Sequence, residues 1–182
     1  MSESENITLT RDVNAVVIPD GHHSTLTKGT VVTIHQSLGT NYTIVTDYGH
    51  MLRIAGADAD ALGKETHNLQ TLVSETDPES VEKNCWEVMK TVYDPEIPVN
   101  IVDLGLVYHC DVTAAGEGLN DIHVQMTLTA PGCGMGPVIQ SDVEKCIRAL
   151  PGVDNINVEV VLDPPWSQDM MSEVAKVQLG LF

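Results

Sequence analysis

Basic residues are scarce in this chain of 182 residues, which has 9 Lys and Arg against 26 Asp and Glu. The resulting formal net charge of −17 repels nucleic acid phosphates and anionic membranes, so neither is expected as a partner. Long apolar runs are also missing, because no stretch approaches the roughly 18 residues that cross a bilayer. The first residues lack the basic segment and the apolar core of a secretory signal. We therefore expect a protein of the cytoplasm.

Two nucleotide-binding motifs are absent, since the sequence has neither a GxxxxGKS or GxxxxGKT loop nor a GxGxxG fingerprint. No nucleotide cofactor is therefore predicted, and any ATP chemistry would have to come from a partner. The four cysteines form no CxxC pair. In a reducing cytosol, an even number of cysteines does not indicate disulfides.

The second part of the chain alternates helical and strand patterns. Asp77 and Pro78 are a typical N-cap and first helical residue, and apolar residues at helical spacing follow them. Apolar and polar residues then alternate in two stretches joined by a glycine-rich turn, which predicts a hairpin. A second helix opens at Pro137 and is followed by a third strand and a closing helix. The hairpin strands, the third strand and the closing helix are expected at residues 105–113, 122–128, 156–162 and 172–179.

This order of helix, strand, strand, helix, strand and helix predicts a small α+β domain over residues 77–182, with helices packed on one face of a small sheet. The first part differs, because it has short β-branched stretches separated by tight turns. Residues 64–77 are polar and acidic and are expected to form a linker. We therefore predict a small all-β module with linker over residues 1–76. Its expected strands are residues 15–18, 30–35, 42–46 and 51–54.

Cys133 is the cysteine that the sequence places in a loop, between a strand-like and a helix-like stretch. Its thiol is expected to project at a helix N-terminus, where backbone N–H groups and the helix dipole favour a thiolate. A thiolate binds soft metals or attacks an electrophile. The alternative for Cys133 is an inert small hydrophobe, the usual role of a lone cysteine. Periodicity favours that core role for Cys85, Cys110 and Cys146.

A second group of chemically capable residues lies at residues 94–105, where two prolines predict a rigid, extended loop. In an extended chain, alternation would place Asp94 and Glu96 on the same side. Rigid carboxylates beside a thiol would complete an iron site or tune the proton affinity of the thiol. The alternative is that both carboxylates cap or solvate a turn, which is their usual role near prolines. Periodicity alone does not place them near Cys133.

Several of these segments together resemble a known family. The acidic loop with the following strand, the turn that contains Cys133, and two motifs near the C-terminus occur in the same order in the metal–sulfur cluster assembly domain family. They are residues 94–108, 129–133, 163–166 and 169–172. In the first part, further segments are similar to the extension of the SufT branch of that family, at residues 11–12, 18–21, 36–40 and 58–63. One departure is Val13, where many chains of the SufT branch have a cysteine.

The resemblance implies an auxiliary factor in iron–sulfur cluster assembly rather than an enzyme with a metabolite substrate. It implies that Cys133 is the metal ligand or the sulfur-handling residue. The residues expected around a transiently bound iron–sulfur cluster or iron are Asp94, Glu96 and Thr129. Trp166 and the methionines after it would help to close this site. The expected partners are the Suf-type cluster assembly machinery and the client apoproteins that receive the cluster.

One good thiolate per chain disfavours a self-contained cluster, because clusters need several cysteine ligands. A homodimer would supply two Cys133 thiolates, or a client would supply the remaining ligands, and both arrangements favour transient binding. Two alternatives stay open. In the first, Cys133 is the nucleophile of a thiol enzyme, which needs a base such as His109 or His123. In the second, the protein is a purely structural adaptor that binds no iron.

Overall fold

The computed structural model describes residues 5–38, 41–66, 74–94 and 96–181. Contacts between Cα atoms divide the chain into two compact units, Met1–Asn68 and Leu69–Phe182. Each unit buries its own set of apolar side chains. In the described part of the chain, no helix is both long and apolar enough to cross a membrane.

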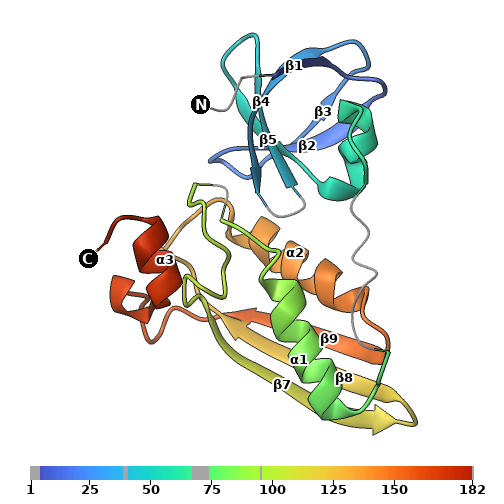
Figure 1. Ribbon diagram of the computed structural model, residues 1–182, viewed down its shortest axis with the longest axis vertical. Coiled ribbons are helices and arrows are strands. Elements are labelled where there is room, and N and C mark those ends of the chain that lie inside the picture. Colours follow the sequence, from blue (N-terminus) through green and yellow to red (C-terminus); the bar gives the residue numbers. More distant parts are fainter. Residues whose placement is uncertain (1–4, 39–40, 67–73, 95, 182) are drawn as a thin grey trace. The chain divides into compact units, whose positions relative to one another are not determined.

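The first unit is built on a six-stranded antiparallel sheet with the order β1-β4-β5-β6-β2-β3 (Figure 1). The strands are β1 (Glu5–Thr8), β2 (Val13–Val17), β3 (His23–Leu26), β4 (Val31–Leu38), β5 (Asn41–Thr46) and β6 (Met51–Ile54). The prediction of an all-β module is confirmed, and four strands coincide with the predicted stretches. The sequence does not predict β1 and β3, because these short strands bury no side chain fully and lack an alternating apolar pattern.

A short 3-10 helix, η1 (Gly56–Leu62), contributes to the core of the first unit. The sheet supplies fully buried side chains such as Ile44 and Ile54. Three residues of η1 belong to the same hydrophobic cluster: Ala59, Ala61 and Leu62. Because η1 carries part of the core, its attachment to the sheet matters for the stability of this unit.

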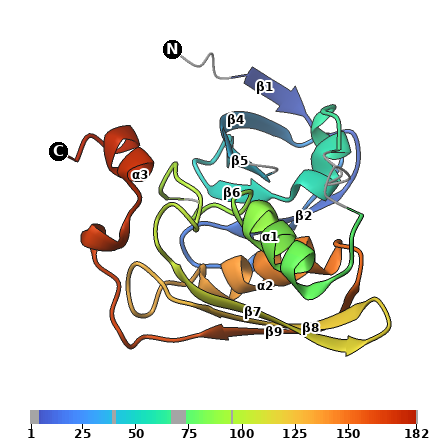
Figure 2. The same cartoon turned by 60° about the horizontal axis from the view of Figure 1, so that its bottom comes forward.

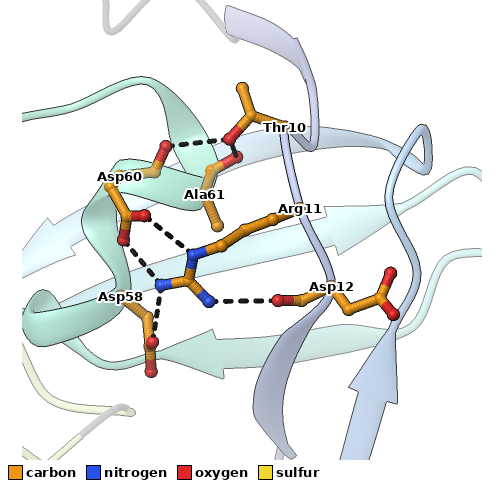
Figure 3. A network of polar contacts seen from close by, with 6 residues as sticks. All are labelled: Thr10, Arg11, Asp12, Asp58, Asp60 and Ala61. Atoms are coloured by element: carbon orange, nitrogen blue, oxygen red, sulfur yellow. Dashed lines mark hydrogen bonds and ion pairs between the residues drawn. The ribbon is translucent and has the colours of Figure 1, made fainter.

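Arg11 attaches η1 to the chain in front of β2 (Figure 3). Its guanidinium donates to both carboxylate oxygens of Asp60, at 2.6 and 2.7 Å, and to Asp58 Oδ1 at 2.8 Å. It also donates to the backbone oxygen of Asp12 at 3.0 Å. Hydrogen bonding to Arg11 lowers the pKa of Asp60, and hydrogen bonding to both carboxylates raises the pKa of Arg11. Two segments that resemble the SufT extension are therefore bonded to each other in this fold.

The second unit is a two-layer α+β domain in which α1 and α2 cover one face of a three-stranded sheet (Figure 2). Its elements are α1 (Pro78–Met89), β7 (Val107–Gly116), β8 (Leu119–Met126), α2 (Gly136–Arg148), β9 (Val153–Val160), η2 (Gln168–Met170) and α3 (Glu173–Gln178). β7 and β8 form the predicted antiparallel hairpin, and β8 pairs parallel with β9 through the crossover helix α2. The predicted α+β class and order of elements are confirmed.

Local signals in the sequence set the start of α1 and the burial of three cysteines. The Asp77 carboxylate accepts the N–H of Ser80 at 3.1 Å, as expected for an N-cap.

Cys85, Cys110 and Cys146 are buried, as predicted. A hydrogen bond with Cys85 raises the pKa of Cys110, and burial raises the pKa of Cys146 to about 12. Cys110 and Cys146 are therefore protonated at neutral pH.

The ends of the predicted linker belong to different units, and its residues 67–73 lie outside the described residues. Lys64 forms an ion pair with Glu5 at 2.7 Å within the first unit. The backbone oxygen of Thr76 accepts a hydrogen bond at 2.8 Å from Asn120, a buried residue of β8. Thr76 therefore packs with the domain that the sequence predicts to begin one residue later. The predicted boundary between residues 76 and 77 stays a prediction.

Candidate functional site

Three connections meet at one end of the sheet in the second unit. Val107 at the start of β7 is opposite Met126 at the end of β8, and Met126 is opposite Val160 at the end of β9. The connections that begin or end there are residues 90–106, 127–135 and 161–172. Ligands of open α/β sheets bind outside the carboxyl ends of parallel strands. The connection that contains Cys133 leaves the sheet at such an end.

A tight turn holds Cys133. Its backbone N–H donates to the oxygen of Ala130 at 3.3 Å, with Pro131 and Gly132 as the two central residues. Gly132 has a φ of 80°, which matches a type II turn with proline in the first central position and glycine in the second. The Cys133 side chain is half-buried, whereas the other three cysteines are buried. Cys133 therefore lies in a loop directly before a helix, as the sequence predicts.

The first N–H groups of α2 are already engaged by the main chain. Gly136 donates to the carbonyl oxygen of Cys133 at 3.1 Å, and Val138 and Ile139 donate to that of Met135 at 3.0 and 2.9 Å. The residue between Gly136 and Val138 is a proline, which has no N–H. The expected support of a thiolate by backbone N–H groups therefore does not come from these donors. The helix dipole is the remaining feature of this helix start that favours a thiolate at Cys133.

The acidic loop is compact rather than extended. Residues 96–105 follow a series of turns and bends. A β-bridge between Tyr93 and Asn100 and a hydrogen bond of 2.9 Å from Ile101 N to Val92 O close the loop. The prolines suggest an extended segment, but these hydrogen bonds between its two ends fold it back on itself.

Asp94 and Glu96 differ in burial, contrary to the expectation that they share one side. Asp94 is 4% exposed, and its carboxylate accepts the N–H of Glu96 at 2.9 Å. Glu96 itself is exposed. Burial raises the pKa of Asp94, because the charged form loses solvation there. Asp94 thus caps a turn, the alternative role weighed above, and is also a buried acid of the acidic loop.

Thr129 is half-buried in the same connection as Cys133. The predicted proximity of Asp94 and Glu96 to Cys133 stays a prediction. Within the described part of the chain, no group of three or more His, Cys, Asp or Glu side chains is gathered so that it could hold a metal ion. A cluster at Cys133 would therefore need ligands beyond those that the described residues of one chain assemble.

Residues 161–172, which we call the C-terminal strap, pack on the connection in front of β7 and on the start of β7. Three hydrogen bonds of 2.7 to 2.8 Å hold the strap there: Trp166 Nε1 to Leu104 O, Tyr108 Oη to Pro164 O, and Ser172 N to Asp103 O. Trp166 is therefore anchored to the end of the acidic loop. Its predicted role in closing the site stays a prediction.

Gly105 lets the C-terminal strap approach closely, a role that the sequence analysis does not find. Its φ is 75°, which favours glycine. A Cβ at this position would overlap the carbonyl oxygen of Met170 and lie 2.8 Å from the carbonyl carbon. The strap begins early, because β9 ends at Val160, two residues before the predicted end. A glycine at the end of the acidic loop is the signal that could have indicated this contact.

The candidate bases, His109 and His123, lie on the sheet face that the helices do not cover. In the register of the hairpin, Asp111 is directly opposite His123. The Nε2 atom of His123 is 3.4 Å from Glu159 Oε2. Both histidines therefore lie on a polar sheet surface in which carboxylates surround His123.

Residues 82–160 match a family model described as iron–sulfur cluster assembly protein, and this segment contains Cys133. An Fe-S protein maturation auxiliary factor from Porphyromonas gingivalis is 43% identical over 99 residues, which are 54% of this chain and 90% of that protein. This chain belongs to the iron–sulfur cluster assembly protein family. The Fe-S protein maturation auxiliary factor YitW from Bacillus subtilis is 43% identical over 103 residues, which are 57% of this chain and 97% of that protein.

A solved structure of the same family has a similar fold. The crystal structure of a domain of unknown function, DUF59, from Bacillus anthracis matches with a TM-score of 0.52 and 39% identity, over 58% of this chain and 96% of that chain. These three proteins are thus matched almost in full by little more than half of this family member. Too few residues remain in them for a counterpart of the first unit. The likeness of that unit to the SufT extension stays a prediction from sequence motifs.

Proposed function

We propose that this family member is an auxiliary iron–sulfur maturation factor that carries an iron–sulfur cluster, or iron, to client apoproteins through Cys133. The observation that carries the proposal is the position of this residue. Cys133 is half-buried in a tight turn at the end of the sheet where ligands bind in related architectures, inside the segment that matches the family model. The relatives are named maturation auxiliary factors, which supports a role in assembly rather than in turnover of a metabolite.

The proposed cargo is held by an incomplete set of ligands. The Cys133 thiolate supplies one soft donor, and the proposed neighbours Thr129, Asp94 and Glu96 supply oxygen donors. Iron–sulfur clusters prefer several thiolates, so the remaining ligands come from the client or from a second chain. Incomplete ligation keeps the cargo exchangeable, which suits a carrier that receives it from Suf-type machinery in the cytoplasm.

The buried carboxyl of Asp94 supports a functional role for the acidic loop. The Asp94 carboxyl is 4% exposed, and the hydrogen bond that the described residues give it comes from a backbone N–H rather than from a cation, so ionisation costs stability. Buried groups with raised pKa values are concentrated at functional sites. Such a group is suited to exchange a proton as a thiolate or a metal arrives nearby.

Anaerobic reconstitution with iron and sulfide tests the proposal. The wild type, Cys133→Ala and Cys146→Ala would be compared by iron content and visible absorption. The Cys146→Ala variant removes a buried thiol from the same helical region and serves as the matched control. We expect Cys133→Ala to lose the chromophore and most of the iron, and Cys146→Ala to keep both. Equal iron content in the two variants would refute ligation by Cys133.

The two other functions predict different results in the same experiment. A purely structural adaptor binds no iron even as the wild type. A thiol enzyme using Cys133 needs a base at the sulfur, but His109 and His123 lie on the outer sheet face, which favours the carrier. The proposed carrier has no catalytic step, and loss of cargo in Cys133→Ala is its distinguishing result.

A further inference from the structure

Exposed apolar side chains are concentrated at the end of the second unit. Among the described residues of this unit, six large apolar residues are exposed: Leu119, Leu162, Met170, Val174, Val177 and Leu181. Five of the six fall within residues 162–181, which lie outside the segment that matches the family model. Single exposed apolar residues are normal, whereas exposed apolar residues that share one face mark an interaction surface, so it matters which of these side chains share a face.

The helix α3 presents two of these side chains to solvent. Ala175 is fully buried and fixes the inner side of the helix. Val174 and Val177, which are 60% and 57% exposed, lie on the outer side, one helical turn apart. Both figures show α3 beside the acidic loop in front of β7 (Figures 1 and 2). Among the residues that the structure describes, the helix therefore has a buried inner side and an exposed outer side.

Both ends of α3 are capped, so the outward valines are held in a defined orientation. The Ser172 hydroxyl accepts an N–H at 3.2 Å as N-cap. At the other end, Leu181 N donates to Lys176 O at 2.8 Å, and Gly180 N donates to Val177 O at 3.1 Å. This pair of bonds is a Schellman motif, which ends a helix and turns the chain back. We call the outward Val174 and Val177 the C-terminal apolar face.

Exposed acidic residues precede the C-terminal apolar face along the chain. Asp163, Asp169 and Glu173 are exposed. Lys176 is the one basic residue in residues 162–181, and its Nζ is 3.5 Å from Glu173. A second copy of this chain would bring the same acidic side chains and a further net charge of −17 to the contact. Charge therefore disfavours self-association and favours a basic partner.

We propose that the C-terminal apolar face docks a segment of a partner protein whose apolar side chains are flanked by lysine or arginine. Stable complexes bury roughly 800 Å² on each partner, which two side chains do not provide. The contact is therefore a transient one. That the partner belongs to iron–sulfur maturation rests on the proposed function, whereas the docking surface itself does not.

A peptide titration followed by amide chemical shifts tests this proposal. The probe is a short synthetic peptide in which leucines are flanked by lysines, and its counterpart has glutamates in place of the lysines. We expect the lysine peptide to shift the amides of residues 162–181, and to bind at least about tenfold more weakly to the double variant Val174→Ser, Val177→Ser, which removes apolar surface without changing the charge. Leu119→Ser, at an exposed apolar position outside the surface, is the matched control and should bind like the wild type. Binding should weaken as salt is added.

Three outcomes would overturn the proposal. The first is equal binding, or no binding, of the two peptides. The second is a set of shifts that avoids residues 162–181 or persists in the double variant. The third is a dimer in sedimentation that the double variant dissolves, because the occupant would then be a second copy. Cys133→Ala should bind the lysine peptide normally, so failure of the docking surface is distinguishable from failure of the proposed carrier function.

Discussion

The two units use their polar side chains in different ways. In the first unit, the charged groups of Arg11, Asp58 and Asp60 are bonded to one another and hold η1 to the chain in front of β2. In the second unit, all four cysteines of the chain are present, and the half-buried Cys133 lies on a connection at the end of the sheet. The Arg11 network stabilises the fold of the first unit. In the second unit, the sulfur of Cys133 stays accessible. We infer that the chemistry belongs to the second unit.

Truncation of a buried core side chain in each unit should have the largest effect on stability. Ile44 in the first unit and Ile147 in the second are both fully buried, so truncation of either to alanine should cost about 2–5 kcal/mol in its own unit. Hydrogen exchange should locate the loss in residues 5–66 for Ile44→Ala and in residues 74–181 for Ile147→Ala. Iron content after reconstitution should fall for Ile147→Ala alone. Loss of iron in Ile44→Ala would contradict the division of roles.

The close approach at Gly105 should produce the next largest effect. Gly105→Ala places a non-glycine residue at positive φ, which costs about 1–2 kcal/mol, and it also pushes Cβ into the backbone of Met170. Gly49→Ala in the first unit is the matched control, because its φ is 79° but nothing lies within 4 Å of the added Cβ. Urea unfolding should show a larger loss for Gly105→Ala. Equal losses of unfolding free energy in the two variants would mean that the C-terminal strap moves away from the added Cβ without destabilising the fold.

Asp94 should give a pH-dependent effect of intermediate size. Its folded-state pKa is raised by burial, so its contribution to stability is full below the unfolded value of about 3.9 and is lost as the pH rises through the folded-state pKa. Asp94→Asn keeps an acceptor for the N–H of Glu96 and cannot ionise. We expect this variant to be more stable than the wild type at pH 7 and similar to it near pH 4.

Urea unfolding at the two pH values measures the Asp94 effect. Glu96→Gln is the control, because the exposed Glu96 side chain should leave stability unchanged at both. A destabilised Asp94→Asn at pH 7 would show that the ionised carboxylate is favourable in the fold, contrary to the raised pKa.

The Arg11 network should give the smallest effect, because exposed ion pairs are screened by solvent. The pKa of Asp60 is lowered by its bonds to Arg11, so the contribution is present above the unfolded value of about 3.9 and is lost as the pH falls through the folded-state pKa. Arg11→Gln should therefore slightly speed hydrogen exchange in η1 at pH 7, less so at high salt. Lys83→Gln, which removes an exposed pair in α1, should leave η1 unchanged.

Elements with local signals could be predicted from the sequence. The N-cap Asp77 and the helical spacing of apolar residues after Pro137 identify α1 and α2 because both signals depend on neighbours in the chain. β1 and β3 could not be found this way, since their stability comes from pairing with β4 and β2 rather than from an apolar pattern of their own.

The candidate site was predictable only in part. The turn around Cys133 follows from Pro131 and Gly132, which specify it locally. The shape of the acidic loop depends on a bridge between Tyr93 and Asn100. The position of the C-terminal strap depends on contacts between residues some sixty positions apart, such as the hydrogen bond from Trp166 to Leu104. Contacts of that separation leave no periodic pattern in the sequence.

Cysteine footprinting tests the central claim most directly. The folded protein would be treated anaerobically with an alkylating reagent, before and after loading with iron and sulfide, and labelling of each cysteine would be read by mass spectrometry. Before loading, Cys133 should be labelled much faster than Cys85, Cys110 and Cys146, which are buried. After loading, Cys133 should be protected and the other three unchanged. Bound iron with undiminished labelling of Cys133 would contradict the account, because the cargo would then be held elsewhere.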